Sequence, residues 1–447
     1  MVYILLILYI VVFCWWIKSS SFFSIQGLSR TLIGCIFISK IVAGLLYGFI
    51  HLSYFNQGDT FLYLSESNLI GQTFTSYPSY YIKSILGLET PLPPIEVFTY
   101  PESAIFWKSL GSYVLVHLHA LLYPITMGYY ELHIFFIAIL GLFAGLNFYK
   151  VFKDILNLPH LVILLLCFGM PSLTFWSSGL HKDAYVYFGL SLVIMGLWEG
   201  QKHTKFSKKL LIGLFIIALA RYYLIALLIP ALFGYWLTLQ APLHKWKIYA
   251  SVYTMSIGAA FLGFKVLLGI DLFQVLSNQQ ADFLTEVGNS SIKNIEPLAP
   301  SLTGVLRMLP IAIVNVLGRP FLWECKDFLQ LLASIEILSF LALVLFAFFA
   351  KKQEQSQPNP LIFFMFVYAI SNLILVGLLV ANTGTIVRYR AIPLFFISIL
   401  LMRILNFKAL LKEQAPTTMP PPKPTPQNQH QVHHTKKVNK QPSFNNK

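Results

Sequence analysis

Charged side chains are scarce in this chain of 447 residues, of which only 11% are Asp, Glu, Lys or Arg and 56% are hydrophobic. Several apolar runs reach about 20 residues, the length that a helix needs to cross a bilayer. The runs are continuous and do not alternate between apolar and polar residues, which excludes a transmembrane β-barrel. We therefore predict an all-α polytopic membrane protein.

Cysteines and metal-binding patterns are also few. The four cysteines are Cys14, Cys35, Cys167 and Cys325, and no two of them have the spacing of metal ligands, so we interpret them as small core residues. The chain contains no Asp-x-Asp, the motif that would suggest a metal site for a nucleotide sugar. We predict no metal ligands, and a divalent cation is left open as a cofactor.

Acidic residues number 18 against 32 lysines and arginines, which gives a formal net charge of +14. The basic residues are spread over short loops and a C-terminal tail, as the positive-inside rule expects, so the charge predicts no nucleic-acid partner. The predicted partner is membrane lipid. No internal repeat is visible, which weighs against a transporter, because many transporters are built from repeats.

The sequence divides into three parts. We predict that residues 1–30 form an extra N-terminal transmembrane helix and a basic loop, that residues 31–406 form a transmembrane core, and that residues 407–447 form a disordered basic tail. Two stretches of the core, 53–131 and 270–327, are predicted to be exterior loops that bear short helices. The charges of the loops then predict about 11 crossings of the cytoplasmic (inner) membrane, with the N-terminus outside and the C-terminus cytoplasmic.

Three stretches of the core depart from simple crossings. Residues 210–239 must leave and return to the interior side, but they are too few for two full crossings of about 20 residues each. We therefore expect two short helices that meet near Arg221. The apolar stretch 112–127 is predicted to lie on the outer face. Lys40 is a charge inside the predicted crossing 31–52, and the sequence offers no partner for it.

The segment PSLTFWSSGLHKD, residues 171–183, separates two apolar runs and places His181, Lys182 and Asp183 together. Charged residues at the mouth of membrane helices are costly unless they face water or a ligand. In the predicted topology these residues share one membrane face with a second set of polar side chains: Asp59, Arg221, Arg319, Glu324, Arg388 and Arg390. Cations beside lone carboxylates indicate a site for an anionic, phosphorylated ligand together with a base.

Most of these residues also have a purely structural interpretation. Asp59 fits a turn or a helix N-cap. Asp183 fits the N-terminus of the following helix, where the helix dipole favours a carboxylate. The remaining alternatives are a structural Arg319–Glu324 pair and contacts of Arg388 and Arg390 with lipid phosphate.

The order of these pieces resembles the GT-C class of membrane glycosyltransferases, and within it the bacterial mannosyltransferase-like branch that uses polyprenyl-phosphate sugars. The resemblance covers residues 31–406 as an architecture, and it implies a GT-C-like helical bundle. Local similarity is confined to four segments: GDTFLYL (58–64), PSLTFWSSGLHKD (171–183), ARYYLIALLIPAL (220–232) and RYRAIP (388–393).

The resemblance also implies a reaction, which is sugar transfer with inversion at the sugar carbon. A carboxylate of the first exterior loop acts as general base in such enzymes, and Asp59 is the residue that matches it. The polyprenyl-phosphate donor would be held by cations, for which Lys182, Arg221, Arg388 and Arg390 are the matching residues. The acceptor would be a lipid-linked glycan, a polysaccharide or a protein.

The chain departs from this family in two respects, and two other functions stay open. The acidic pair usual in the second exterior region is not evident unless Glu286, Glu296 or Glu324 supplies it, and one helix precedes the shared core. A surface-polysaccharide polymerase or ligase that uses undecaprenyl-diphosphate glycans would depend on the arginines and not on Asp59. A lipid or solute transporter would move its substrate without forming a covalent product.

Overall fold

The computed structural model describes residues 1–405 except 55–57, 89–103, 157, 204–206, 242–243, 286–291, 293–294 and 351–358, and except the side chains of 104–109 and 203. The predicted tail, Glu286 and part of the exterior loop 53–131 lie outside the described residues. The described part of the chain is helical and contains no strand.

In the part of the chain that the structure describes, eight helices are long and apolar enough to cross a membrane. They are α1 (Val2–Ser19), α2 (Arg30–Ser53), α6 (Tyr130–Ile155), α11 (Tyr222–Gln240), α12 (Lys245–Leu268), α15 (Phe328–Phe349), α16 (Pro360–Leu379) and α17 (Thr383–Ile404). The prediction of an all-α polytopic membrane protein is therefore confirmed.

The larger number of crossings predicted from the loops is not confirmed. Residues 161–177 are divided into α7 (His160–Phe168) and α8 (Pro171–Trp176), because proline has no N–H with which to continue the helix. The helix α9 (Lys182–His203) carries charged residues near both ends, and α10 (Lys208–Ala220) has only 13 residues.

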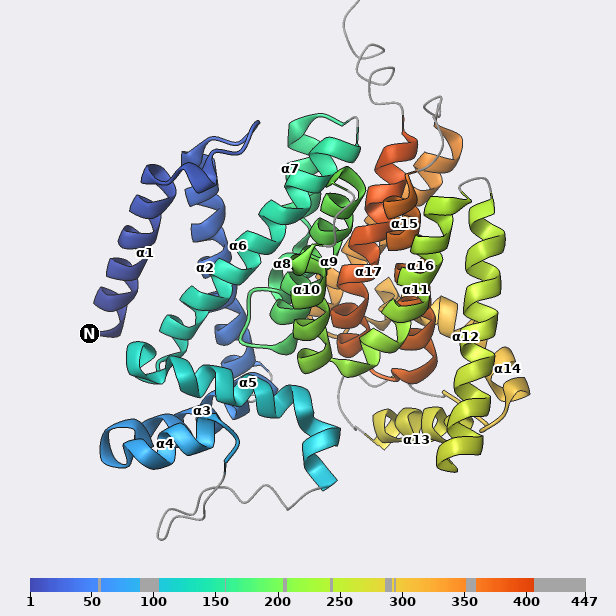
Figure 1. The fold of residues 1–447 in the computed structure, drawn as a ribbon, viewed down its shortest axis with the longest axis horizontal. Helices are drawn as coiled ribbons and strands as arrows, with labels where there is room; N and C mark the ends of the chain where they lie inside the picture. Colours follow the sequence, from blue (N-terminus) through green and yellow to red (C-terminus); the bar gives the residue numbers. More distant parts are fainter. Residues whose placement is uncertain are drawn as a thin grey trace, which may run out of the picture. The chain divides into compact units, whose positions relative to one another are not determined.

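Shorter helices gather at one end of the bundle. There α5 runs across the ends of the longer helices, next to α3 and α4, and α13 lies at the same end (Figure 1). The bounds of the elements not yet given are α3 (Gly58–Ser76), α4 (Pro78–Ile85), α5 (Ala104–Thr126), α13 (Leu272–Thr285), α14 (Leu302–Gly318), η1 (Ser21–Phe23) and η3 (Leu322–Glu324). The two stretches predicted as exterior loops contain these helices, of which α5 has 23 residues and α3 has 19.

Aromatic rings and glycines pack the centre of the bundle. The ring of Phe148 in α6 lies 5.3 Å from that of Tyr187 in α9 and 5.1 Å from that of Phe395 in α17, measured between centroids. A Cβ on Gly213 of α10 would lie 2.5 Å from the carbonyl oxygen of Gly189 in α9, so only glycine permits this approach. This close packing sets the beginning of α9 beside the end of α10.

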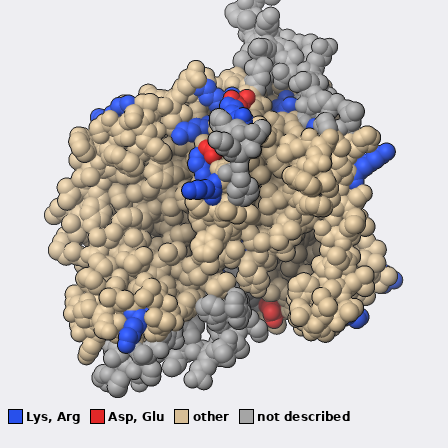
Figure 2. Space-filling view, viewed as in Figure 1, with Lys and Arg blue, Asp and Glu red and all other residues tan. Residues whose placement is uncertain are grey.

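The surface is largely uncharged. Figure 2 shows a broad face of uncharged residues, with Lys, Arg, Asp and Glu gathered mainly near its upper edge. Where α6 and α9 end and α10 begins, Lys202 pairs with Asp154 at 3.1 Å and Lys209 pairs with Glu199. A wide uncharged surface is expected where a protein contacts hydrocarbon.

Candidate functional site

Asp183, in the first turn of α9, is the centre of a buried ion cluster. It accepts hydrogen bonds from the NH2 group of Arg221 at 2.7 Å and from Nε of Arg388 at 2.6 Å. The Nδ1 atom of His181 lies 3.2 Å from the same carboxylate. The exposed fractions are 10% for the Asp183 side chain, 6% for Arg221 and 15% for Arg388. One carboxylate therefore joins α9, the α10–α11 junction and α17.

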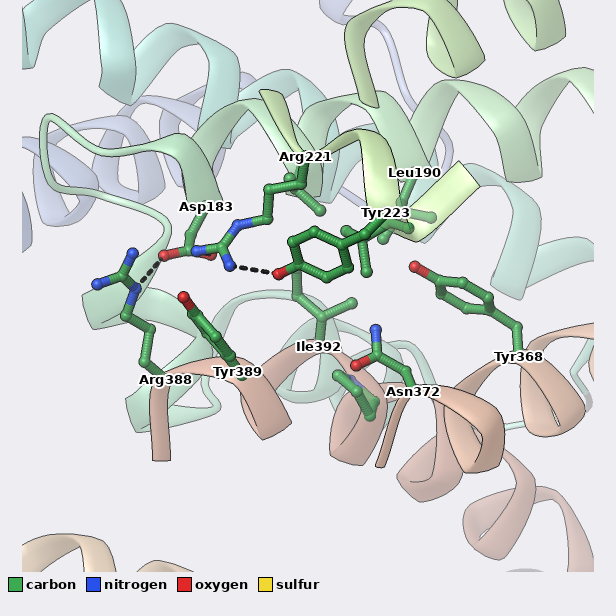
Figure 3. A pocket seen from close by; sticks show the side chains of 12 residues that line it. Asp183, Leu190, Arg221, Tyr223, Tyr368, Asn372, Arg388, Tyr389 and Ile392 are labelled. Atoms are coloured by element: carbon green, nitrogen blue, oxygen red, sulfur yellow. Dashed lines mark hydrogen bonds and ion pairs between the residues drawn. The ribbon is translucent and has the colours of Figure 1, made fainter. Parts of the chain in front are cut away.

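Arg221 interrupts the helix between α10 and α11, and two tyrosines hold its side chain. Its NH1 group donates to the hydroxyl of Tyr223 at 2.6 Å, and its guanidinium carbon lies 4.2 Å from the ring centroid of Tyr389 (Figure 3). A planar guanidinium stacks well on an aromatic ring. The helix break expected near Arg221 is present, but only α10 is short, with 13 residues, whereas α11 has 19 and is a candidate membrane span. Neither tyrosine was among the predicted site residues.

Asp59 reaches this cluster through His181. Its Oδ2 atom lies 3.5 Å from Nε2 of His181, and the NH2 group of Arg388 lies 2.8 Å from the same nitrogen. The Asp59 side chain is 61% exposed, whereas that of His181 is 2% exposed. Asp59 lies inside the first turn of α3 and not at its N-cap, and the helix dipole favours a carboxylate there. It is the carboxylate of the cluster that a ligand can reach.

Lys182 supplies a further cation beside Asp59. Its Nζ atom lies 5.7 Å from the ring centroid of Tyr63, which also belongs to α3. Within the described ranges, Lys182 has no carboxylate partner, whereas Arg221 and Arg388 both pair with Asp183. Lys182 is therefore the cation whose charge is most available to an anionic ligand.

Two charged side chains from candidate membrane spans hold the segment before the cluster. Lys40 of α2 is 1% exposed, and its Nζ donates to the hydroxyl of Ser177 at 3.1 Å. Glu336 of α15 accepts from the backbone N–H of Ser172 at 3.0 Å and from the Ser172 hydroxyl, and so caps the start of α8. Glu336 was not among the predicted residues, although a lone carboxylate in an apolar run is a recognisable signal.

The structure does not bring Arg319, Glu324 and Arg390 into this cluster. Arg319 and Glu324 pair with each other at 2.7 Å, which is the structural alternative. Arg390 is buried and donates to the carbonyl of Val316 at 3.0 Å and to that of Arg319. These contacts join α17 to the end of α14. Residues two apart on a helix do not share a face, so Arg388 and Arg390 diverge.

A small cavity lies against the buried side of the cluster. Its volume is about 20 Å³, and its lining includes Arg221, Tyr223, Tyr368 and Asn372 (Figure 3). This is room for about one water molecule. A ligand larger than a water molecule does not fit there, so it would contact the cluster from the exposed side, where Asp59 lies.

Neighbouring groups set the protonation of the two acid–base residues of the cluster. The hydrogen-bonding contact with His181, together with the charges of Arg388 and Lys182, lowers the pKa of Asp59 to about 2, although partial burial acts in the opposite direction. Burial and the charge of Arg388 lower the pKa of His181 below its ordinary value of 6.5. At pH 7 Asp59 is therefore a carboxylate and His181 is neutral.

We expect the folded protein to lose stability as the pH falls, in two ranges. His181 resists protonation in the folded state, so stability declines once unfolded chains take up its proton below the ordinary pKa of 6.5. The contribution of Asp59 is complete above its ordinary value of 3.8 and is lost as the pH falls toward 2. Thermal unfolding between pH 8 and pH 4, with His181→Gln beside wild type, checks the first range; an identical slope in both proteins would contradict it.

The described residues contain no group of three or more His, Cys, Asp or Glu side chains able to hold a metal ion. The apolar helices and the buried ion cluster define a multi-pass α-helical membrane protein with a polar site at one end of its bundle. Searches with protein-family models, among curated proteins and among solved structures find no match to this chain.

Proposed function

We propose that this protein is a GT-C-like membrane glycosyltransferase that takes a sugar from a polyprenyl-phosphate donor on the outer face of the cytoplasmic membrane. The observation that carries the proposal is the exposed Asp59 carboxylate beside Lys182 and the Asp183–Arg221–Arg388 cluster. Such a site combines a proton acceptor with cations that can bind a phosphate. The acceptor would be a lipid-linked glycan, a polysaccharide or a protein.

The charge of the cluster supports a donor with a single phosphate. Lys182, Arg221 and Arg388 carry three positive charges, Asp59 and Asp183 carry two negative charges, and one positive charge remains. A polyprenyl-phosphate sugar is a phosphodiester with one negative charge, which balances that remainder. A diphosphate-linked glycan carries more negative charge than the one positive charge that remains on the cluster, so it is the weaker candidate for the donor.

The chemical step can be written with these residues. Asp59 takes the proton of the acceptor hydroxyl while the hydroxyl oxygen forms a bond to the anomeric carbon. The bond between that carbon and the phosphate oxygen breaks, and its electron pair leaves with the polyprenyl phosphate. Lys182, with support from Arg388, stabilises the charge that develops on the departing phosphate.

Donor binding would also prepare Asp59 for this role. A carboxylate with a pKa of about 2 is a weak base, and general bases work best when their pKa lies near the working pH. The phosphate adds a negative charge and engages Lys182 and Arg388, two of the groups that hold the pKa low. Both effects raise the pKa of Asp59 when the donor is in place.

A substitution at Lys182 tests the donor class. We expect Lys182→Met to raise the KM for a radiolabelled polyprenyl-phosphate sugar about tenfold to a hundredfold, because one hydrogen bond between charged groups is lost. The control is Lys265→Met, since Lys265 is 67% exposed and pairs with Asp271. An unchanged KM for Lys182→Met would remove this lysine from the donor site. Transfer only from diphosphate-linked glycans would favour the polymerase or ligase.

A further inference from the structure

A groove between α11 and α12 lies away from the ion cluster. Its volume is about 520 Å³, and nine residues line it: Phe233, Leu237, Lys247, Ile248, Ser251, Val252, Met255, Ser256 and Ala259. Arg221 precedes α11, and Phe233 and Leu237 follow it by 12 to 16 residues, about 18–24 Å along a helix. The groove therefore belongs to the other half of the bundle.

Lipid is the medium that this groove faces. Both helices are candidate membrane spans, and only 6% of the apolar window of α12 is buried inside the protein. Phe233 is 52% exposed and Met255 is 73% exposed. If the groove were empty, its lining atoms would lose their dispersion contacts on that side, so we expect it to be filled. In a bilayer the available occupant is a flexible hydrocarbon chain.

The beginning of α12 marks the depth of one membrane surface. Trp246 is 66% exposed, and its ring meets the edge of Phe363 with centroids 4.6 Å apart, so the indole is held in place. Tryptophan is enriched at the level of lipid headgroups. Lys247 follows directly, is exposed and lines the groove. Its ammonium thus stands at the end of the groove nearest the headgroups.

The length of the groove matches one leaflet. Lys247 and Ala259 are 12 residues apart on α12, which corresponds to about 18 Å. Half of a bilayer's hydrocarbon core is about 15 Å thick. One acyl chain can therefore follow the groove from the headgroup level toward the middle of the membrane. Ser251, Ser256 and Ala259 are small and leave the space that the chain occupies.

We infer that this groove binds one anionic glycerophospholipid from the leaflet opposite to the ion cluster. The acyl chain lies between α11 and α12, and the phosphate-bearing headgroup contacts Lys247. A basic residue at the membrane surface favours anionic over zwitterionic lipid by about fivefold. The lipid fills the open space between α11 and α12 and so supports the attachment of α12 to the bundle.

Native mass spectrometry of the full chain in detergent tests this inference, with phosphatidylglycerol and phosphatidylcholine of identical acyl chains as probes. Wild type is expected to retain one phosphatidylglycerol with about fivefold preference. Lys247→Met should lose the preference and still retain lipid. Ser256→Leu fills the groove and should retain neither lipid.

Two matched variants separate the groove from general effects. Gly263→Leu places the same leucine side chain on α12 at a position where a Cβ has nothing within 4 Å, and it should bind like wild type. Lys265→Met removes a lysine from the other end of α12 and should keep the preference. Undiminished binding by Ser256→Leu, or an undiminished preference in Lys247→Met, would overturn the inference. Thermal unfolding of each variant shows whether it is folded.

Discussion

The Asp183→Ala variant is expected to unfold with a free energy about 3–5 kcal/mol lower than wild type, because it leaves two buried guanidinium groups without their carboxylate. Arg221 and Arg388 both donate to Asp183, at 2.7 and 2.6 Å, and the three side chains are at most 15% exposed. Denaturant unfolding of the purified protein in detergent measures the change.

Asp154→Ala is the matched control for this experiment. Asp154 also pairs with a cation, Lys202, but its side chain is 43% exposed. A pair so accessible to solvent contributes about 0–1 kcal/mol. If Asp183→Ala destabilised the protein no more than Asp154→Ala does, Asp183 would not be the centre of a buried cluster.

Asp59→Asn is expected to lower kcat for sugar transfer about a hundredfold to ten-thousandfold, the range that a positioned general base contributes. The amide keeps the size of the side chain but cannot accept the proton of the acceptor hydroxyl. The free energy of unfolding should fall less than in Asp183→Ala, because the Asp59 side chain is 61% exposed and its stabilising contact with His181 is weakened by solvent. The KM for the donor should also change little, because Lys182 and Arg388 remain.

The control for Asp59 is Glu131→Gln, which neutralises an acid in the first turn of α6. It should transfer sugar at the wild-type rate. Steady-state kinetics of both variants with the same donor and acceptor separate kcat from KM. A wild-type kcat in Asp59→Asn would show that Asp59 is not the general base. The cations of the cluster would then need another function.

Much of the candidate site follows from the sequence, because the expense of burying charge in a membrane limits where charge can stand. The HKD segment, Arg221 and Arg388 interrupt or flank apolar runs. The structure joins Asp183 to both arginines, and His181 to Asp183 and Arg388. The helical break at Arg221 was also predictable, since the apolar stretch around it is too short for two crossings.

Other features could not be read from local patterns. Lys40 bonds to Ser177, 137 residues later, and Glu336 bonds to Ser172, 164 residues earlier, so neither partner is marked in the neighbouring sequence. The separation of Arg390 from Arg388 depends on the direction of each side chain around α17. Loop charges also do not show whether a helix is long enough to cross the membrane. The helix α7, for example, ends at Phe168, before Pro171.

The most direct measurement is label transfer by purified wild-type protein and Asp59→Asn from a panel of radiolabelled polyprenyl-phosphate sugars to an acceptor fraction of lipid-linked glycan or polysaccharide. We predict a covalently labelled product with wild type alone. Product from both proteins would retain a glycosyltransferase and contradict the assignment of Asp59. Movement of labelled lipid across liposomes without any covalent product would contradict the enzyme itself and favour a transporter.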